Sequence, residues 1–130
     1  MDLYKEVKLF RKSMLKIKPD DYLFELFSLY PNNCCEFASY LLAKYLKEEL
    51  NLENVILVRA ENRHKRSLRH VWLRYQSMDI DITAYQFSST NKTVIVECYS
   101  PWHERFSIFD KENVDTTFNQ FHDLSRIDLL

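Results

Sequence analysis

The chain has 130 residues, of which 46% are hydrophobic and 15% aromatic, and this composition excludes an intrinsically disordered chain. The length suits one domain over residues 1–130, large enough to bury a core. The formal net charge of −1 argues against a general nucleic-acid binder, and the absence of a long apolar run argues against a membrane protein.

The N-terminus lacks the apolar stretch of a secretory signal, and the three cysteines, two of them adjacent, do not suggest a disulfide framework. We therefore expect a cytoplasmic protein with reduced thiols. The chain contains no glycine, which excludes Gly-rich phosphate loops and dinucleotide fingerprints. Backbone positions with positive φ are expected to be occupied by Asn, Asp or Ser.

The chain begins with two predicted helices. Apolar residues recur every three or four positions over residues 2–18, which predicts an amphipathic helix with a basic, solvated face. A shorter helix is predicted over residues 20–30. Pro19 ends the first helix and Pro31 ends the second, because proline interrupts the helical hydrogen-bond pattern.

A third helix is predicted over residues 34–50, and its broad apolar stripe indicates the central, buried helix. Asn33 is a good N-cap for it. Cys34 and Cys35 then fall in the first turn, and both project toward the apolar stripe. Helical geometry does not choose between the two thiols.

Four strands are predicted next, over residues 54–60, 68–75, 78–84 and 93–99. A short helix is predicted over residues 114–124. Helices followed by an antiparallel sheet indicate an α+β fold, with the third helix packed on the sheet.

The second and third predicted strands form a hairpin whose register follows from their apolar residues. All six of these residues share one face only if the hairpin turns at Gln76-Ser77 and Leu73 lies opposite Ile80, since a slip of one residue would reverse one strand. The opposite face then carries His70, Trp72, Asp79, Asp81 and Thr83. His70 and Asp81 become diagonal neighbours about 7–8 Å apart, within reach of each other's side chains.

A thiol at a helix start, an imidazole and a carboxylate together suit nucleophilic catalysis by cysteine. The thiolate is the reactive form, and a helix N-terminus or an adjacent imidazolium lowers the pKa of a thiol. Amides at the helix start could bind an oxyanion. Asn32 or Asn33 could add a side-chain donor there, although capping is the alternative role for Asn33.

Two motifs resemble those of transglutaminase-like, papain-fold cysteine proteins. His70-Val71-Trp72-Leu73 and Asp81-Ile82-Thr83 are similar to the His-Ala-Trp and Asp-x-Thr motifs of that superfamily. Further segments resemble a set of small bacterial members: the helix that carries Cys35 with Ala38-Ser39, residues 81–87 and residues 100–106. The resemblance covers about residues 30–106.

This resemblance implies that Cys35 is the nucleophile, His70 the general base and Asp81 the acid that orients the base. It implies a peptidase, deamidase or transglutaminase that acts on a protein or peptide amide without a cofactor. The choice of Cys35 over Cys34 rests on the resemblance. The chain departs from the family pattern at Glu36-Phe37, where a small or acidic pair is expected, and no glycine precedes the thiol.

Four other residues near the predicted site have candidate roles, and three of them have two possible roles. Asp79 shares the face of His70 and is the second candidate for the acid. Gln86 either bonds near the site or stabilises a turn. Trp72 packs in the core or lines the pocket, and His103 lines the pocket or lies in a surface loop.

The sequence leaves two alternative functions and one open role for a neighbouring loop. Bulky Phe37 beside the thiol suits an inactive member of the fold that serves as a protein-binding or immunity-like module. The basic loop over residues 63–69 either attracts an acidic substrate or is simply solvated. A zinc module would use Cys34, Cys35 and Cys98 with His70 or His103, but adjacent cysteines lack the usual ligand spacing, so no metal is expected.

Overall fold

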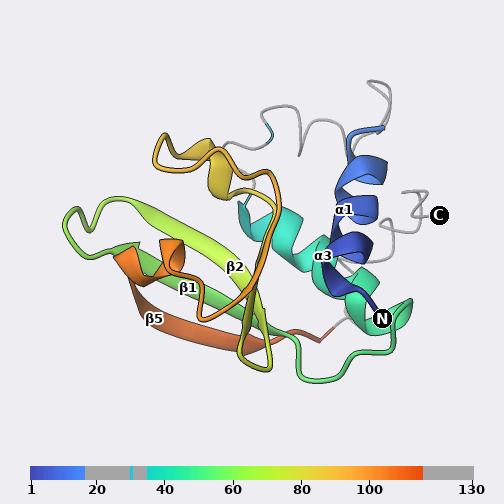
Figure 1. Ribbon diagram of the computed structural model, residues 1–130. Coiled ribbons are helices and arrows are strands. Elements are labelled where there is room, and N and C mark those ends of the chain that lie inside the picture. Colours follow the sequence, from blue (N-terminus) through green and yellow to red (C-terminus); the bar gives the residue numbers. More distant parts are fainter. Residues whose placement is uncertain (17–29, 31–34, 116–130) are drawn as a thin grey trace.

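The computed structural model describes residues 1–16, 30 and 35–115, and these form an α+β fold. A five-stranded antiparallel sheet has the strand order β4-β3-β2-β1-β5, and α1 and α3 accompany it (Figure 1). Neither described helix is long and apolar enough to cross a bilayer. The elements in chain order are α1 (Leu3–Met14), α3 (Cys35–Glu48), β1 (Ile56–Asn62), β2 (Arg69–Tyr75), β3 (Met78–Asp81), the 3-10 helix η1 (Ala84–Gln86), β4 (Ile95–Cys98), the 3-10 helix η2 (Trp102–Arg105) and β5 (Phe106–Asn113).

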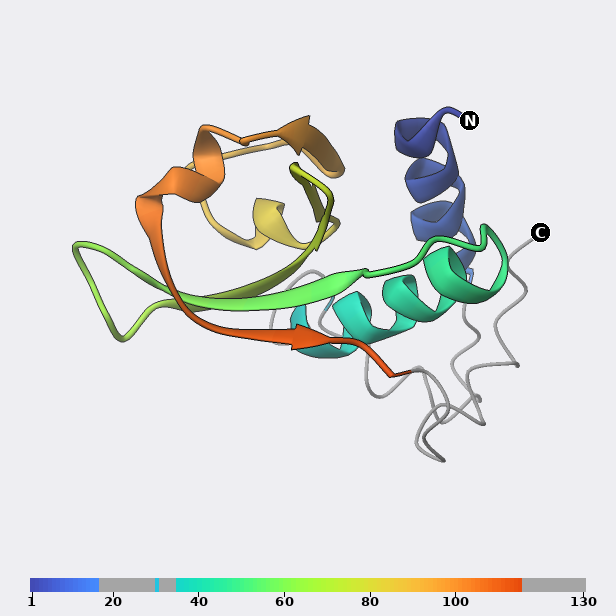
Figure 2. The same ribbon diagram turned by 90° about the horizontal axis from the view of Figure 1, so that it is seen from below.

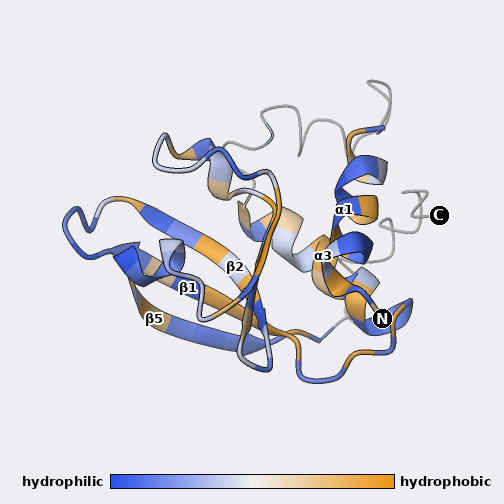
Figure 3. Ribbon diagram, viewed as in Figure 1, coloured by the Kyte–Doolittle hydropathy of each residue, from blue (hydrophilic) through white to orange (hydrophobic). Residues whose placement is uncertain are grey.

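Helix α1 confirms the first predicted helix but is shorter. The Asp2 carboxylate accepts a hydrogen bond from the Lys5 amide at 3.1 Å and so caps the N-terminus of the helix. Val7, Phe10 and Met14 are its buried residues, so the predicted apolar stripe faces the core. Figure 3 shows the resulting change between hydrophobic and hydrophilic residues along its turns.

Several predictions fall wholly or partly outside the described residues. Of the second predicted helix only Tyr30 is described, and it lies in a turn. The predicted cap at Asn33 and its neighbours Asn32 and Cys34 lie outside. Of the predicted C-terminal helix only positions 114 and 115 are described, and they are not helical; the Val114 amide bonds to the Val55 carbonyl at 3.2 Å.

The β2–β3 hairpin has the predicted register, with Leu73 opposite Ile80 and Tyr75 opposite Met78. The strand boundaries differ from the prediction: β1 begins and ends two residues later, β2 begins one residue later, β3 ends at Asp81, and β4 is shorter, at Ile95–Cys98. Strand β3 ends early because the chain turns into η1 at Ala84. The hydrophobic alternation therefore predicted the pairing better than the strand ends.

Strand β5 and the preceding helix η2 were not predicted. The pairing of β5 with β1 shifts between Arg59 and Ala60, which lie opposite Asp110 and Ile108. Phe109 is therefore the extra residue of a β-bulge, and a bulge exchanges the two faces of a strand. Because this shift breaks the two-residue alternation, and because the C-terminal half of β5 is hydrophilic (Figure 3), the sequence pattern did not indicate a strand.

The sheet separates two hydrophobic clusters. The helix-side core lies between the sheet and the helices and includes Val71, Leu73 and Ile80, as the register predicted. The far-side core occupies the opposite face, where η1 and η2 lie (Figure 2). The far-side core contains Val58, Ala60, Trp72 and Phe106, with Ile56, Phe87, Trp102 and Ile108 packed against them.

The chain turns without glycine at four described positions with positive φ. Asn51 and Asn54 both have φ 57°, as expected from the ability of asparagine to adopt the left-handed region. Gln76 and Tyr99 were not expected there, with φ of 57° and 49°. Gln76 forms the tight β2–β3 turn, and Tyr99 turns the chain between β4 and η2.

Leu73→Ala should lower the free energy of unfolding by about 2–5 kcal/mol, because it leaves a cavity in a filled core. Leu73 is 0% exposed in the helix-side core. Urea denaturation measures the change. Leu68→Ala is the matched control, since Leu68 is 38% exposed, and it should change stability by less than about 0.5 kcal/mol. Equal losses in the two variants would contradict this core assignment.

Candidate active site

The predicted imidazole–carboxylate pair forms a direct contact in the structure. His70, the second residue of β2, places Nε2 2.6 Å from Oδ2 of Asp81, the last residue of β3. Both side chains are buried, at 0% and 2% exposure. The diagonal relation that the hairpin register predicted therefore brings these two groups into hydrogen-bond contact.

The Asp81 carboxylate accepts hydrogen bonds on both oxygens. Oδ1 accepts from the Thr83 amide at 2.8 Å and from its hydroxyl at 3.3 Å. Oδ2 lies 2.6 Å from Nε2 of His70 and 2.6 Å from Nε2 of His103. Burial would raise the pKa of Asp81, but His70 and His103 outweigh burial and hold that pKa below its ordinary value.

The other side of the His70 ring faces the thiol and an amide. Burial alone would lower the pKa of His70, but the Asp81 carboxylate and the Cys35 thiol outweigh burial and raise it to about 9. Gln86 Nε2 lies 3.4 Å from Nδ1 of His70. Nε2 of the ring faces Asp81, and Gln86 lies at the other nitrogen, Nδ1. Cys35 is near enough to His70 to raise its pKa, so Cys35, His70, Asp81 and Gln86 form one group.

Aromatic side chains of the far-side core surround the His70 ring. Trp72 stacks with it at a centroid distance of 5.7 Å, and Phe87 and Trp102 meet it edge-on at 5.2 and 5.6 Å. The ring has no exposed surface. These contacts exclude water from the hydrogen bond to Asp81, and a low local dielectric strengthens such a bond.

Helix α3 carries Cys35, which is half-buried and free of disulfide bonds. The next residue, Glu36, is fixed by Arg59 of β1, whose guanidinium Nε lies 3.0 Å from Oε1 of Glu36. Arg59 also bonds Asp110 of β5 at 2.7 Å and so ties α3 to two strands. Phe37 is half-buried against the helix-side core.

A second arginine, Arg11 of α1, anchors the segment that carries Gln86. Its guanidinium donates to the Tyr85 hydroxyl at 3.0 Å and to the Tyr30 hydroxyl at 3.2 Å. The Tyr30 hydroxyl in turn donates to the Ile82 carbonyl. Helix α1 therefore fixes η1, where Gln86 follows Tyr85, against the rest of the fold.

Asp79, the second candidate for the acid, has no histidine partner among its hydrogen bonds. Its Oδ1 accepts from Trp72 Nε1 at 2.9 Å and from Arg74 Nη2 at 2.9 Å, and its Oδ2 accepts from the Ser100 amide at 3.0 Å. Asp79 thus holds the β4–η2 connection against β2. Trp72 is a core residue with 0% exposure rather than a pocket residue.

His103 is buried beside Asp81. It is 4% exposed, so it is not a surface-loop residue, and the prediction that it lines a pocket stays a prediction. Its Nε2 bonds Asp81 at 2.6 Å and its Nδ1 bonds the Ser100 hydroxyl at 2.7 Å. Sequence reasoning missed this contact because it depends on how η2 folds back over β3; the aromatic residues around His103 were the signal that this segment is buried.

The zinc set that grouped cysteines with histidines is not formed in the described part of the chain. The group there with suitable geometry for a cation is His70, Asp81 and His103, whose ligand atoms lie within 4.8 Å of one another. It contains no cysteine. Cys98 is exposed, with its sulfur 3.8 Å from the Ser77 hydroxyl.

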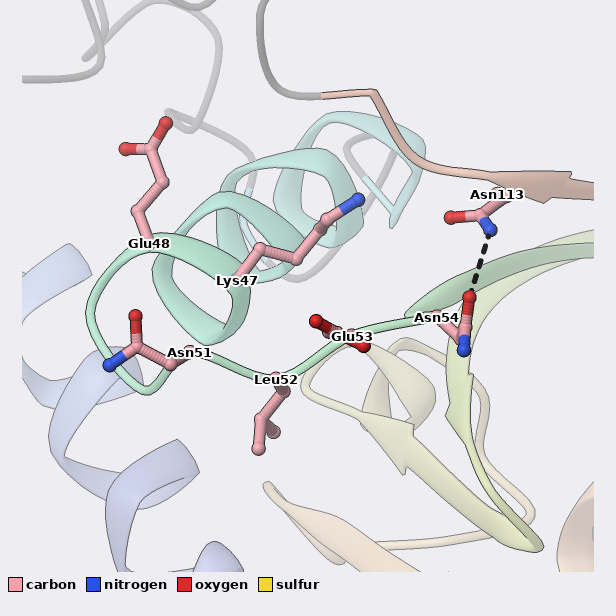
Figure 4. Close-up of a pocket in the computed structure, with 7 residues that line it drawn as sticks. All are labelled: Lys47, Glu48, Asn51, Leu52, Glu53, Asn54 and Asn113. Carbon is pink, nitrogen blue, oxygen red and sulfur yellow. Dashed lines mark hydrogen bonds between the residues drawn. The ribbon is translucent and has the colours of Figure 1, made fainter.

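A polar groove lies away from this site, at the C-terminal end of α3 (Figure 4). Cys35, His70 and Asp81 do not line this groove. The charged residues that line it are one lysine and two glutamates. Its lining residues are Lys47, Glu48, Asn51, Leu52, Glu53, Asn54 and Asn113. It offers no nucleophile with a neighbouring base, so the candidate active site is the group around His70.

A scan against family models and searches of curated proteins and of solved structures found no match for this chain.

The raised pKa of His70 predicts a decline in stability with rising pH. A group with a raised folded-state pKa stabilises the fold below its unfolded pKa, about 6.5, and loses that contribution as the pH rises through the folded value of about 9. Urea unfolding from about pH 6 to about pH 10 should show a loss of about 3 kcal/mol in the parent relative to His70→Gln. Parallel pH profiles for the two proteins would contradict the assignment.

Proposed function

We propose that this protein is a cysteine-dependent hydrolase or acyltransferase that acts on amide or peptide bonds, with a transglutaminase-like, papain-type core. In this proposal Cys35 is the nucleophile, His70 is the general base and Asp81 orients His70. The substrate is a protein or peptide that supplies an amide acyl donor. The chemistry needs no cofactor, and the reduced thiol suits the cytoplasm.

The observation that carries the proposal is one buried imidazole between a carboxylate and a thiol. His70 bonds Asp81 at 2.6 Å and interacts with Cys35 on its other side. A nucleophilic thiol requires a base within reach and a third group that orients the base. A histidine with a purely structural role would need only polar partners, whereas this one has a thiol as its second neighbour.

The hydrogen bonds of His70 determine which nitrogen transfers the proton. Nε2 donates its proton to Asp81, so Nδ1 accepts the proton of the Cys35 thiol. The sulfur then bonds the carbonyl carbon of the substrate, and the C=O electron pair moves to oxygen. When this oxyanion collapses, the C–N bond breaks and the leaving amine takes the proton from Nδ1. The Nε2 proton stays on His70, hydrogen-bonded to the Asp81 carboxylate, throughout.

The second half of the reaction starts from a thioester on Cys35. Water or an amine attacks the thioester carbonyl while Nδ1 of His70 takes the proton of the attacking group. The C–S bond breaks, and the proton passes from Nδ1 to the sulfur, which restores the thiol. Attack by water gives a peptidase or deamidase, and attack by an amine gives a transglutaminase.

Two groups of N–H donors could stabilise the oxyanion. The Gln86 side chain already lies at the reacting nitrogen of His70, 3.4 Å from Nδ1. In this proposal α3 also starts at the nucleophile, so that its first backbone amides have no partner within the helix and point toward the substrate oxygen. Donors fixed before reaction stabilise developing charge most effectively.

A second candidate is a non-catalytic module of the same fold that binds a partner protein through the surface around Cys35 and Gln86. The observation that favours it is the 0% exposure of His70, since a substrate could reach the imidazole only from the side of the thiol. Reactivity of Cys35 separates the two candidates.

Cys35 should react with iodoacetamide at pH 7 at least about ten times faster than free cysteine, because an adjacent imidazolium stabilises the reactive thiolate. The measurement uses a variant with Cys34→Ser and Cys98→Ser, which leaves Cys35 as the single cysteine. His70→Ala should reduce the rate to that of free cysteine.

The matched control keeps Cys34 and replaces Cys35 and Cys98 with serine. This protein should react slowly, and His70→Ala should leave its rate unchanged. A parent rate at Cys35 no faster than free cysteine would favour the non-catalytic module.

Gln86→Ala should lower the rate of acylation by p-nitrophenyl acetate about 10- to 100-fold, because removal of an oxyanion donor destabilises the transition state. The burst of p-nitrophenol at Cys35 measures this rate. Gln76→Asn is the control, because Gln76 is an exposed turn residue outside the site. Equal bursts in the parent and Gln86→Ala would exclude Gln86 as a donor.

A further inference from the structure

His103 occupies the second side of the Asp81 carboxylate. Its Nε2 and the Nε2 of His70 both lie 2.6 Å from the same oxygen, Oδ2 of Asp81. A carboxylate oxygen has two lone pairs, so each can accept one N–H. His103 comes from η2, far along the chain from β2 and β3, and it is 4% exposed.

Ser100 holds the other ring nitrogen of His103. The Ser100 hydroxyl lies 2.7 Å from Nδ1 of His103, and the Ser100 amide donates to Asp79 at 3.0 Å. A serine hydroxyl can donate or accept a hydrogen bond, so it can pair with Nδ1 whether or not Nδ1 carries a proton. Both ring nitrogens of His103 therefore have a partner while Nε2 faces Asp81.

The anchor of Ser100 is itself rigid. Asp79 binds the Trp72 indole at 2.9 Å and the Arg74 guanidinium at 2.9 Å, and it is 2% exposed. A continuous series of hydrogen bonds therefore leads from Arg74 through Asp79, Ser100 and His103 to Asp81. The groups in the series come from β2, from β3, from the β4–η2 connection and from η2.

We propose that His103 is a positioning residue, whose imidazole completes the set of four donors around Asp81 and so keeps that carboxylate ionised and directed at His70. The inference rests on the proposed function of Cys35 and His70. Without His103, one lone pair of a buried carboxylate loses its partner, and the side chain can rotate away from His70. The His70 imidazolium then has a less well placed counter-ion.

A bound cation is the competing explanation of this cluster, since two imidazoles and a carboxylate are metal ligands. Ligand atoms around a tetrahedral Zn²⁺ with bonds near 2.0 Å lie about 3.3 Å apart. Both nitrogen–oxygen distances here are 2.6 Å, which is a hydrogen-bond separation and is shorter than the spacing of two ligands on one zinc ion. The geometry therefore favours shared protons over a metal ion.

The test compares His103→Leu with His103→Gln in the protein that retains Cys35 as its single cysteine. Leucine removes the donor, whereas the glutamine amide can still donate to Asp81. The iodoacetamide rate at pH 7 should fall about tenfold or more in His103→Leu and stay within about threefold of the parent in His103→Gln, because misplaced catalytic groups lose rate steeply. The titration midpoint of His70, followed by NMR, should fall by about one pH unit or more in His103→Leu.

Ser100→Ala is the second variant, and it decides the question if His103→Leu does not fold. It keeps the ring but removes the hydrogen-bond partner of Nδ1, so the ring is held less firmly against Asp81, and it should lower the iodoacetamide rate about threefold and lower the His70 midpoint. Parent-like rates and midpoints in the variant that folds would show that His103 only fills space. One divalent cation per purified chain, lost in His103→Gln, would overturn the proposal in favour of a metal site.

Failure of the proposed function has a different signature. If His70→Ala does not slow the alkylation of Cys35, the nucleophile assignment is wrong. The role of His103 is then still decided by the His70 midpoint: a fall in His103→Leu supports it, and an unchanged midpoint overturns it.

Discussion

The buried carboxylate of Asp81 is the group on which the far side of this fold depends. A charge with 2% exposure is tolerated in a protein interior only when donors surround it, and Asp81 has them from His70, His103 and Thr83. These donors come from β2, η2 and the turn after β3. To satisfy one carboxylate, the chain must therefore bring three separate segments together, and in doing so it fixes the orientation of His70.

The candidate site combines residues from both sides of the sheet. Helix α3 lies on the helix side and carries Cys35, whereas His70 projects into the aromatic far-side core. Arg59 ties α3 to β1 and β5, and Arg11 ties η1 to α1. Both arginines lie outside the proposed chemistry, yet they fix the two segments that carry Cys35 and Gln86 near one imidazole. Precise placement of this kind is what a proton-transfer site requires.

The sequence predicted the parts of the site that depend on a single hairpin. A period of two residues assigned every side chain of β2 and β3 to a face, and the turn at Gln76-Ser77 then determined that His70 and Asp81 are diagonal neighbours. Strand β5 escaped prediction because its bulge at Phe109 exchanges the two faces midway. The role of His103 escaped prediction because no local pattern relates η2 to β3. Asp79 and Asp81 lie on the same face of β3, so the two-residue alternation could not choose between them as the acid. Only their hydrogen-bond partners in the structure distinguished them.

The sequence by itself determined the α+β class, the buried helix α3, the hairpin register and the shared face of His70 and Asp81. Those features follow from local periodicity and from the need to bury apolar side chains, which short stretches of chain already encode. Only the tertiary structure decided that Cys35 lies near enough to raise the pKa of His70, that Gln86 lies at Nδ1 and that His103 bonds the second side of Asp81. These contacts join segments distant in the chain, and their geometry is set by the packing of the whole sheet against its helices and turns.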